Sequence, residues 1–276
     1  MSTRKPSVAD KFYPGSKREL ESMFTNLLNN EKGKIKSDLS EKTIIGAVVP
    51  HAGYIYSGYE ATHFFEILKK SHIVYDCVFI INPNHTGYGS SISLDENEFW
   101  ETPLGRIEID KDFAELLDFD KSEKAHKFEH SGEVILPFLQ HYLEYNFKIL
   151  PLCILSQTFE NAKIIAQKIY NTNQELKKKI LIIASSDFSH FVEPEEGIKL
   201  DDMALKGIME FNSEDVYKTI IQNNISVCGY GPIMVLLEYS KLVTDSPNID
   251  ILSRGNSGKN MPSNEVVDYI SILVYQ

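Results

Sequence analysis

Three histidine-containing segments each follow an apolar run in this sequence. The segments are Pro50–Tyr54, Asn82–Gly87 and Ser185–His190, and the runs that precede them are 44–49, 77–81 and 180–184. Each run has the composition of a buried β-strand. Because binding sites of open α/β sheets form at the carboxyl ends of parallel strands, we expect the three loops to converge on one place. Histidines placed in this way indicate a metal centre or an acid–base centre.

His51, His85 and Cys228 are the residues that could bind a metal ion. Two imidazoles and one anionic ligand, with coordination positions left open, form the arrangement of mononuclear non-haem iron sites. Cys228 precedes a glycine-rich turn that is expected to open a helix, where the helix dipole lowers the pKa of a thiol. We therefore predict an iron site, and the soft sulfur would also admit copper or zinc. The competing interpretation is that the histidines are hydrogen-bonded loop residues and Cys228 is a free, redox-active thiol.

Further titratable residues could supply acid–base chemistry. Asp187 could orient His190, or both could face one cavity and exchange protons; alternatively, Asp187 caps a helix and His190 lies on the surface. His130 and Glu133 could form a second acid–base pair or, with Glu129, support the metal ligands. The alternative for Glu133 is a charge at a helix start. The other histidines carry no motif and are expected to be solvated or at the edge of the core: His63, His72, His126 and His141.

The composition excludes several kinds of partner. The chain of 276 residues has 28 basic and 39 acidic side chains, a formal net charge of −11, and no long basic run. Nucleic acids and anionic membranes require a positive footprint, so we expect a small-molecule substrate or a peptide instead. No apolar stretch approaches the roughly 20 residues of a membrane span, and the first residues lack an apolar signal segment, which predicts a cytoplasmic protein. The sequence also lacks a dinucleotide-binding fingerprint and a Gly-x-Ser-x-Gly hydrolase motif.

Strands and helices are expected to alternate along the chain. Strands are predicted at 43–49, 75–81, 148–154 and 179–185, with a β excursion at 91–94 and 105–109 and two final strands at 249–253 and 266–275. Helices are predicted at 58–70, 111–117, 132–145, 160–171, 201–211, 213–223 and 232–242. This order predicts a single three-layer α/β domain over residues 1–276, with a mostly parallel central sheet, helices on both faces and an antiparallel edge. Linker-like stretches are expected at 31–42, 120–127 and 256–264.

Taken together, these motifs resemble those of the Memo family, named for the mediator of ErbB2-driven cell motility. The resemblance covers nearly the whole chain, and Asp10, Asn82, Gly132 and Ile135 depart from the family pattern. The matching segments are Arg4, Pro6, Ala9 and Phe12–Pro14; Pro50–Tyr54 with Ser57 and Gly58; Pro83–His85; Trp100–Gly105; Glu129–Ser131, Glu133 and Leu136–Phe138; Ser185–His190; and Cys228, Gly229 and Pro232.

The resemblance implies a fold similar to class III extradiol dioxygenases, which use non-haem iron. It also implies a metal site of His51, His85 and Cys228, in which Cys replaces the carboxylate of the dioxygenases, so ring cleavage does not follow directly. Eukaryotic Memo is linked to phosphotyrosine-peptide binding and to iron or copper handling. Prokaryotic relatives are often encoded beside a radical-SAM protein and an AMMECR-type protein, which implies these as pathway partners.

Two functions follow from the sequence. In the first, the protein is a metal-dependent oxidoreductase, in which iron acts on a small substrate while His190, Asp187 and His130 move protons. In the second, it is a non-catalytic binding protein that uses the same cleft for a peptide carboxylate, a phosphate or a metal ion.

Overall fold

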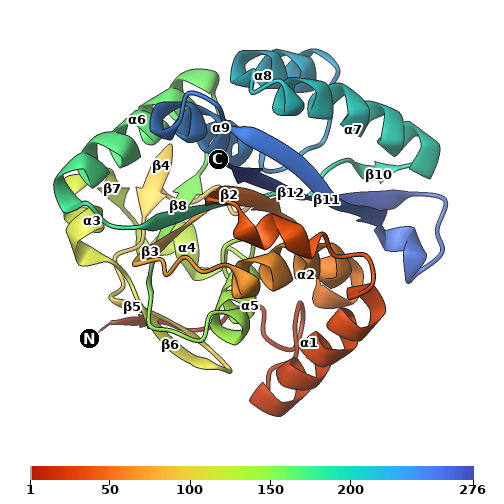
Figure 1. Cartoon of the computed structure of the whole chain (residues 1–276), viewed down its shortest axis with the longest axis horizontal. Helices are drawn as coiled ribbons and strands as arrows, with labels where there is room; N and C mark the ends of the chain where they lie inside the picture. Colours follow the sequence, from red (N-terminus) through yellow and green to blue (C-terminus); the bar gives the residue numbers. More distant parts are fainter. Residues whose placement is uncertain (1) are drawn as a thin grey trace.

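Four parallel strands form the centre of the main sheet in the computed structural model, which describes residues 2–276 (Figure 1). Their order is β2 (Ile44–Val49), β9 (Ile180–Ser185), β3 (Cys77–Pro83) and β8 (Lys148–Ile154). Every residue of β2, β9 and β3 is buried, because layers of helices cover both faces of the sheet. The expected strands are therefore present, and their carboxyl ends meet at one edge.

Antiparallel strands complete the sheet on both sides. On one side, β12 (Val266–Tyr275) pairs with β2, and β11 (Asn248–Asn256) and β10 (His190–Val192) pair with β12. On the other, β4 (Ile92–Leu94) is antiparallel to β8, and β7 (Asp120–Lys121) is parallel to β4. The last two strands are antiparallel, as expected. The sheet as a whole is mixed, however, so the prediction of a mostly parallel sheet is not confirmed.

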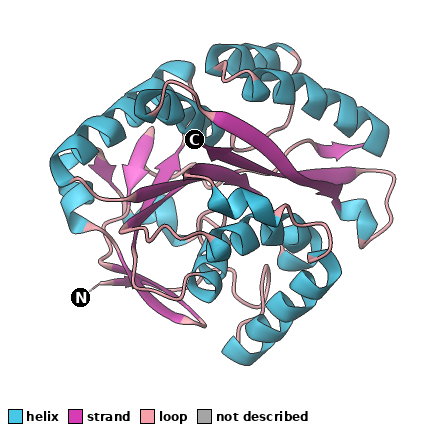
Figure 2. Ribbon diagram, in the orientation of Figure 1, coloured by secondary structure: helices cyan, strands magenta, loops and turns pink. Residues whose placement is uncertain are grey.

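Helices lie on both faces of the sheet (Figure 2). One layer contains α1 (Lys17–Glu31), α2 (Tyr54–Lys70) and α5 (Ile135–Tyr142), with α2 packed on β2, β11 and β12. The other contains α6 (Phe159–Leu176), α7 (Pro194–Met209), α8 (Ser213–Gln222) and α9 (Tyr230–Val243), with α9 packed on β9. A short helix, α3 (Lys111–Leu116), contacts α6. No helix within residues 2–276 is long and apolar enough to cross a membrane.

A small second sheet joins the start of the chain to its middle. Its strands are β1 (Thr3–Arg4), β5 (Phe99–Thr102) and β6 (Gly105–Glu108), in that order. The pairing of β1 with β5 brings the N-terminal segment beside the centre of the sequence, although 96 residues separate Ser2 from Glu98. The β excursion expected at 91–94 and 105–109 is present as β4 and β6, whereas β1 and β5 were not expected. The two residues of β1 are too few to show a strand periodicity.

All three expected linkers contain regular structure. Residues 31–42 include η1 (Ser37–Glu41), residues 120–127 form β7 and α4 (Glu123–Lys127), and residues 256–264 include η2 (Ser257–Lys259). Helix α1 was missed altogether, although Ser16 accepts a hydrogen bond from the main-chain N–H of Glu19 and so caps it. The helix expected at 132–145 begins only at Ile135, after a buried segment without helical structure.

Candidate metal centre

The structure brings His51, His85 and Cys228 together. His51 follows β2, His85 follows β3, and Cys228 comes just before α9. One ligand atom from each residue can be chosen so that all three atoms lie within 4.8 Å of one another. His51 is buried, His85 is exposed and Cys228 is partly accessible. This is the convergence expected from the carboxyl ends of neighbouring strands.

Two local features place His85 and Cys228. The side chain of Asn84 accepts hydrogen bonds from the main-chain N–H groups of Thr86 and Gly87, which closes a tight turn around His85. The turn before α9 packs directly on the end of β9, where a Cβ atom at Gly229 would lie 2.3 Å from the carbonyl oxygen of Ser185. Only glycine allows this approach, which brings Cys228 to the sheet edge.

The hydrogen bonds of His51 define its protonated nitrogen. Its Nδ1 lies 2.8 Å from the Ser185 hydroxyl, which lies 2.7 Å from the carbonyl oxygen of Ser131. A carbonyl only accepts, so the single hydroxyl proton of Ser185 is donated to Ser131. The hydroxyl oxygen then accepts from His51 Nδ1–H. The lone pair of His51 Nε2 therefore faces the Cys228 Sγ, 3.2 Å away.

His85 has the same tautomer for a different reason. Its Nδ1 lies 2.9 Å from Glu129 Oε1, and its main-chain N–H donates to Glu129 Oε2 over 2.5 Å. Burial acts to raise the pKa of Glu129, but hydrogen bonds from His85 and Ser131 outweigh it and hold the pKa at about 2. An ionised carboxylate only accepts, so Nδ1 of His85 carries the proton and Nε2 is free to bind a ligand.

The groups around Cys228 shift the pKa of its thiol in opposite directions. Burial raises the pKa of its thiol, and the neighbouring carboxylate of Asp187 adds to this rise. The main-chain N–H of Asp187 donates towards Sγ over 3.2 Å, which favours the thiolate. The expectation that the helix start lowers the pKa of this thiol is therefore wrong for the protein without a cation. A bound cation would reverse the balance, because a metal ligates the deprotonated sulfur.

Asp187 and His190 lie at the same edge without pairing. Asp187 accepts the main-chain N–H of His51 over 2.8 Å, and its burial raises its pKa to about 6. His190 Nδ1 lies 2.8 Å from the carbonyl of Ser226, which therefore orients the ring in place of Asp187. The strand β10 begins at His190, so Asp187 is not a helix cap.

A cavity of about 390 Å³ adjoins this cluster. Asp187, His190 and His130 line it together with a wall of mostly apolar side chains. The His130 ring lies 4.6 Å from that of His85 and 5.4 Å from that of His51, measured between centroids. Burial lowers the pKa of His130 to about 4, so this imidazole is neutral at pH 7. The predicted acid–base residues thus share one cavity beside the predicted ligands.

Glu133, by contrast, faces away from the cluster. Its carboxylate pairs with Arg4 at 2.7 Å and accepts hydrogen bonds from the Tyr13 hydroxyl and from the main-chain N–H groups of Ser7 and Val8. The interpretations of Glu133 as an acid–base group and as a helix-start charge are both wrong. It anchors the N-terminal segment, which in turn packs Phe12 against His130 with ring centroids 4.8 Å apart.

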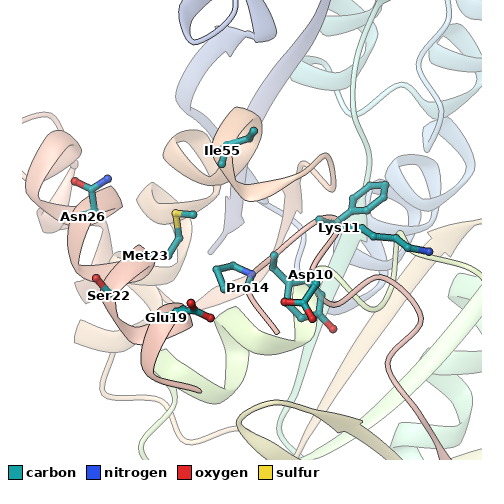
Figure 3. Close-up of a pocket in the computed structure, with 10 residues that line it drawn as sticks. Asp10, Lys11, Pro14, Glu19, Ser22, Met23, Asn26 and Ile55 are labelled. Atoms are coloured by element: carbon teal, nitrogen blue, oxygen red, sulfur yellow. The ribbon is translucent and has the colours of Figure 1, made fainter. Parts of the chain in front are cut away.

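This segment also lines a second hollow, of about 620 Å³, whose lining residues are drawn in Figure 3. It lies between the loop containing Asp10 and Pro14 and the helix α1, which contributes Glu19 and Met23. None of the proposed ligands lines it.

Two of the residues expected to depart from the family pattern meet in space. Gly132 lies against the side chain of Asn82, where a Cβ atom would approach Asn82 Oδ1 to 2.8 Å. Both residues are buried behind the His85 loop. Asn82 therefore occupies the space that a larger residue at 132 would need.

Two of the histidines without motifs are buried, contrary to expectation. His126 is fully buried with Nε2 3.0 Å from the carbonyl of Ser93, and His63 contacts Glu31 at 3.2 Å. His141 stacks on Phe24 at the core edge and His72 is exposed, as predicted.

Comparison with known proteins identifies the family. Residues 4–273 match the family described as Memo-like protein. The chain belongs to the Memo-like family. MEMO1 family proteins of Methanococcoides burtonii and Methanosarcina barkeri are 36% and 38% identical to it over 274 and 279 residues, and each comparison covers 98% of this chain and 99% of the relative. A MEMO1 family protein of Sulfurisphaera tokodaii is 37% identical over 283 residues, which covers 98% of both chains.

One solved structure has a similar fold. The crystal structure of an uncharacterized protein from Escherichia coli K12 aligns with a TM-score of 0.53 and 13% identity, over 83% of this chain and 99% of that one. At this identity, the likeness concerns the fold alone. The Memo-like assignment confirms the resemblance found in the sequence.

Proposed function

We propose that this Memo-like protein is a metal-dependent redox enzyme that binds iron through His51, His85 and Cys228 and acts on a small substrate. One observation carries the proposal. His51 Nε2 lies 3.2 Å from the Cys228 Sγ, and one ligand atom from each of His51, His85 and Cys228 lies within 4.8 Å of the others. A donor set of two imidazoles and a thiolate suits iron, and also copper or zinc.

The residues around the ligands have the properties that a redox centre requires. Iron held there would supply redox chemistry and open coordination positions for a substrate. His190 is held at Nδ1, so its Nε2 is free to give or take a proton. His130 is a neutral base against both ligand rings, and Asp187 is a carboxyl whose raised pKa of about 6 lies near neutrality. Both neighbour the cavity in which a substrate would bind.

The proposal also includes the kind of ligand, the pathway partners and the location of the protein. The cavity of about 390 Å³ suits a small molecule rather than a folded partner. The family resemblance adds a fold related to class III extradiol dioxygenases, and radical-SAM and AMMECR-type proteins as pathway partners. A cytoplasmic location, expected from the sequence, belongs to the proposal as well.

A second candidate is a binding protein that performs no chemistry. Lys11 lines the same cavity as His130 and His190, and its ammonium group would attract an anion such as a peptide carboxylate or a phosphate. This function predicts anion binding that survives removal of the metal, and it requires no turnover.

Metal analysis on matched variants tests the proposal. The wild type, His51→Ala, Cys228→Ser and a control, His72→Ala, are purified and reconstituted with ferrous iron without oxygen, and bound iron is measured. His72 is exposed, with 85% of its side chain accessible. We expect near-stoichiometric iron in the wild type and in the control, and little in the other two. A wild type that retains no iron after reconstitution would exclude the proposed iron enzyme.

A further inference from the structure

The carboxylate of Glu129 lies directly behind His85. The residue is 1% exposed, and its two oxygens contact both the ring and the main chain of His85, at 2.9 Å from Nδ1 and 2.5 Å from the amide nitrogen. We propose that Glu129 is a positioning residue that fixes the ring orientation and the tautomer of His85, so that Nε2 faces the metal position. This inference rests on the proposed function, since it assigns the purpose of the fixed ring to metal binding.

The hydrogen bonds of Glu129 require a carboxylate. Oε1 accepts from His85 Nδ1, from the main-chain N–H of Ser131 and from the Ser131 hydroxyl, and Oε2 accepts from the His85 main chain. All of these partners are donors. A glutamine would place an NH₂ group against at least one of them in either orientation of its amide. The arrangement is therefore specific for an acceptor with two oxygens, although glutamine has nearly the same shape.

Ser131 extends this support to the other imidazole. Its carbonyl accepts the Ser185 hydroxyl over 2.7 Å, and that hydroxyl accepts from His51 Nδ1 over 2.8 Å. The side chain of Glu129 thus holds His85, and the carbonyl of Ser131 holds His51 through the hydroxyl of Ser185. Ligands held by such outer hydrogen bonds need less reorganisation when the metal binds, and losing one of them typically weakens metal binding about 10- to 100-fold.

Glu133 provides a matched control four residues further along. It is as buried as Glu129 and equally satisfied, but its partners all belong to the N-terminal segment: Arg4, Ser7, Val8 and Tyr13. Removing its charge perturbs the same stretch of chain without touching either histidine ring. A merely structural role for Glu129 would make the two substitutions equivalent.

The test reads the His85 tautomer before any metal is added. Nitrogen-15 NMR of histidine-labelled, metal-free protein distinguishes an imidazole protonated at Nδ1 from one protonated at Nε2. We expect His85 to be protonated at Nδ1 in the wild type and in Glu133→Gln, and to become a mixture of tautomers in Glu129→Gln. Affinity for ferrous iron, measured by competition with a chelator, should fall about 10- to 100-fold in Glu129→Gln and less than twofold in Glu133→Gln.

The two measurements separate the two proposals. A wild-type His85 protonated at Nε2 overturns the positioning role, even if the protein binds iron. Equal tautomers and equal affinities in Glu129→Gln and Glu133→Gln overturn it as well. A wild type with the expected tautomer but no affinity for iron refutes the proposed function and leaves the positioning of His85 supported. If Glu129→Gln does not fold, Glu129→Asp replaces it, because its shorter side chain keeps the charge but cannot hold both His85 contacts, and the wild-type spectrum remains decisive.

Discussion

A buried pair of carboxyl groups should contribute stability that is lost as pH rises from 4 to 7. Asp201 and Asp268 lie beneath the loop that carries Asp187 and His190. Asp201 Oδ1 accepts the main-chain N–H and the hydroxyl of Ser189, over 3.0 Å and 2.6 Å. Asp268 Oδ2 is buried, and no donor contacts it within residues 2–276. We expect a proton held between the two carboxyl groups to satisfy this oxygen.

The size of this change in the free energy of unfolding follows from the pKa of Asp268. Burial, followed by repulsion from Asp201, raises this pKa from 3.8 to about 7. Between these values the folded protein holds a proton that the unfolded chain has released, so the free energy of unfolding falls as pH rises. Three pH units at about 1.36 kcal/mol each set a ceiling of about 4 kcal/mol. Because the nearby Arg254 is 28% exposed and admits solvent screening, we expect about half of this, on the order of 2 kcal/mol.

Asp268→Asn isolates this contribution. Its amide donates to Asp201 at every pH, so the variant should match the wild type near pH 4.5 and exceed its stability by about 2 kcal/mol at pH 8. Urea unfolding of both proteins across this range measures the difference. Other buried groups act equally in both proteins and cancel, among them Asp187 and Glu60, whose pKa values burial raises to about 6 and about 7, and His130, whose pKa burial lowers to about 4. Asp245→Asn, at an exposed position, is the control. A stability difference that does not change with pH would refute the shared proton.

Three further predictions concern the N-terminal anchor, the packing behind the His85 loop and the metal. Arg4→Met leaves the buried Glu133 carboxylate without its cation and should lower the free energy of unfolding by about 3–5 kcal/mol, measured with urea; a loss below 1 kcal/mol would contradict the anchor. Gly132→Ala forces a Cβ atom to 2.8 Å from Asn82 Oδ1 and should cost about 1–3 kcal/mol, most of which Asn82→Ala in the same chain should restore. Ferrous iron at 100 times its dissociation constant should stabilise the wild type by about 2.7 kcal/mol in thermal unfolding, and a chelator should reverse this; an equal gain in Cys228→Ser would place the iron elsewhere.

The sequence predicts the central strands of the main sheet, but it does not predict the short outer strands. The runs 44–49, 77–81 and 180–184 are apolar throughout, which is typical of strands buried on both faces, and the structure confirms them. The short strands β1, β7 and β10 form only because distant segments offer hydrogen-bond partners, and no local pattern predicts such pairing. Helix α1, however, was detectable: Ser16 precedes apolar residues at helical spacing, namely Leu20, Phe24 and Leu27.

The candidate site, too, could be predicted only in part from the sequence. The convergence of His51 and His85 followed from strand ends, and Cys228 was expected at a helix start; their grouping is confirmed as a spatial arrangement. The division of roles between Glu129 and Glu133 could not be predicted, because the segment before α5 is not helical and spacing does not define where its side chains point. The partner of His190 was also missed, since Ser226 is 36 residues away and contributes a main-chain carbonyl, which any residue type could supply.

X-ray absorption spectroscopy on iron-reconstituted protein tests the central claim most directly, because it counts the sulfur ligands of the metal. We predict a first coordination sphere with one sulfur and two imidazole nitrogens in the wild type, and loss of the sulfur contribution in Cys228→Ser. An iron sphere made only of nitrogen and oxygen in the wild type, or a spectrum that Cys228→Ser leaves unchanged, would contradict a centre built from His51, His85 and Cys228.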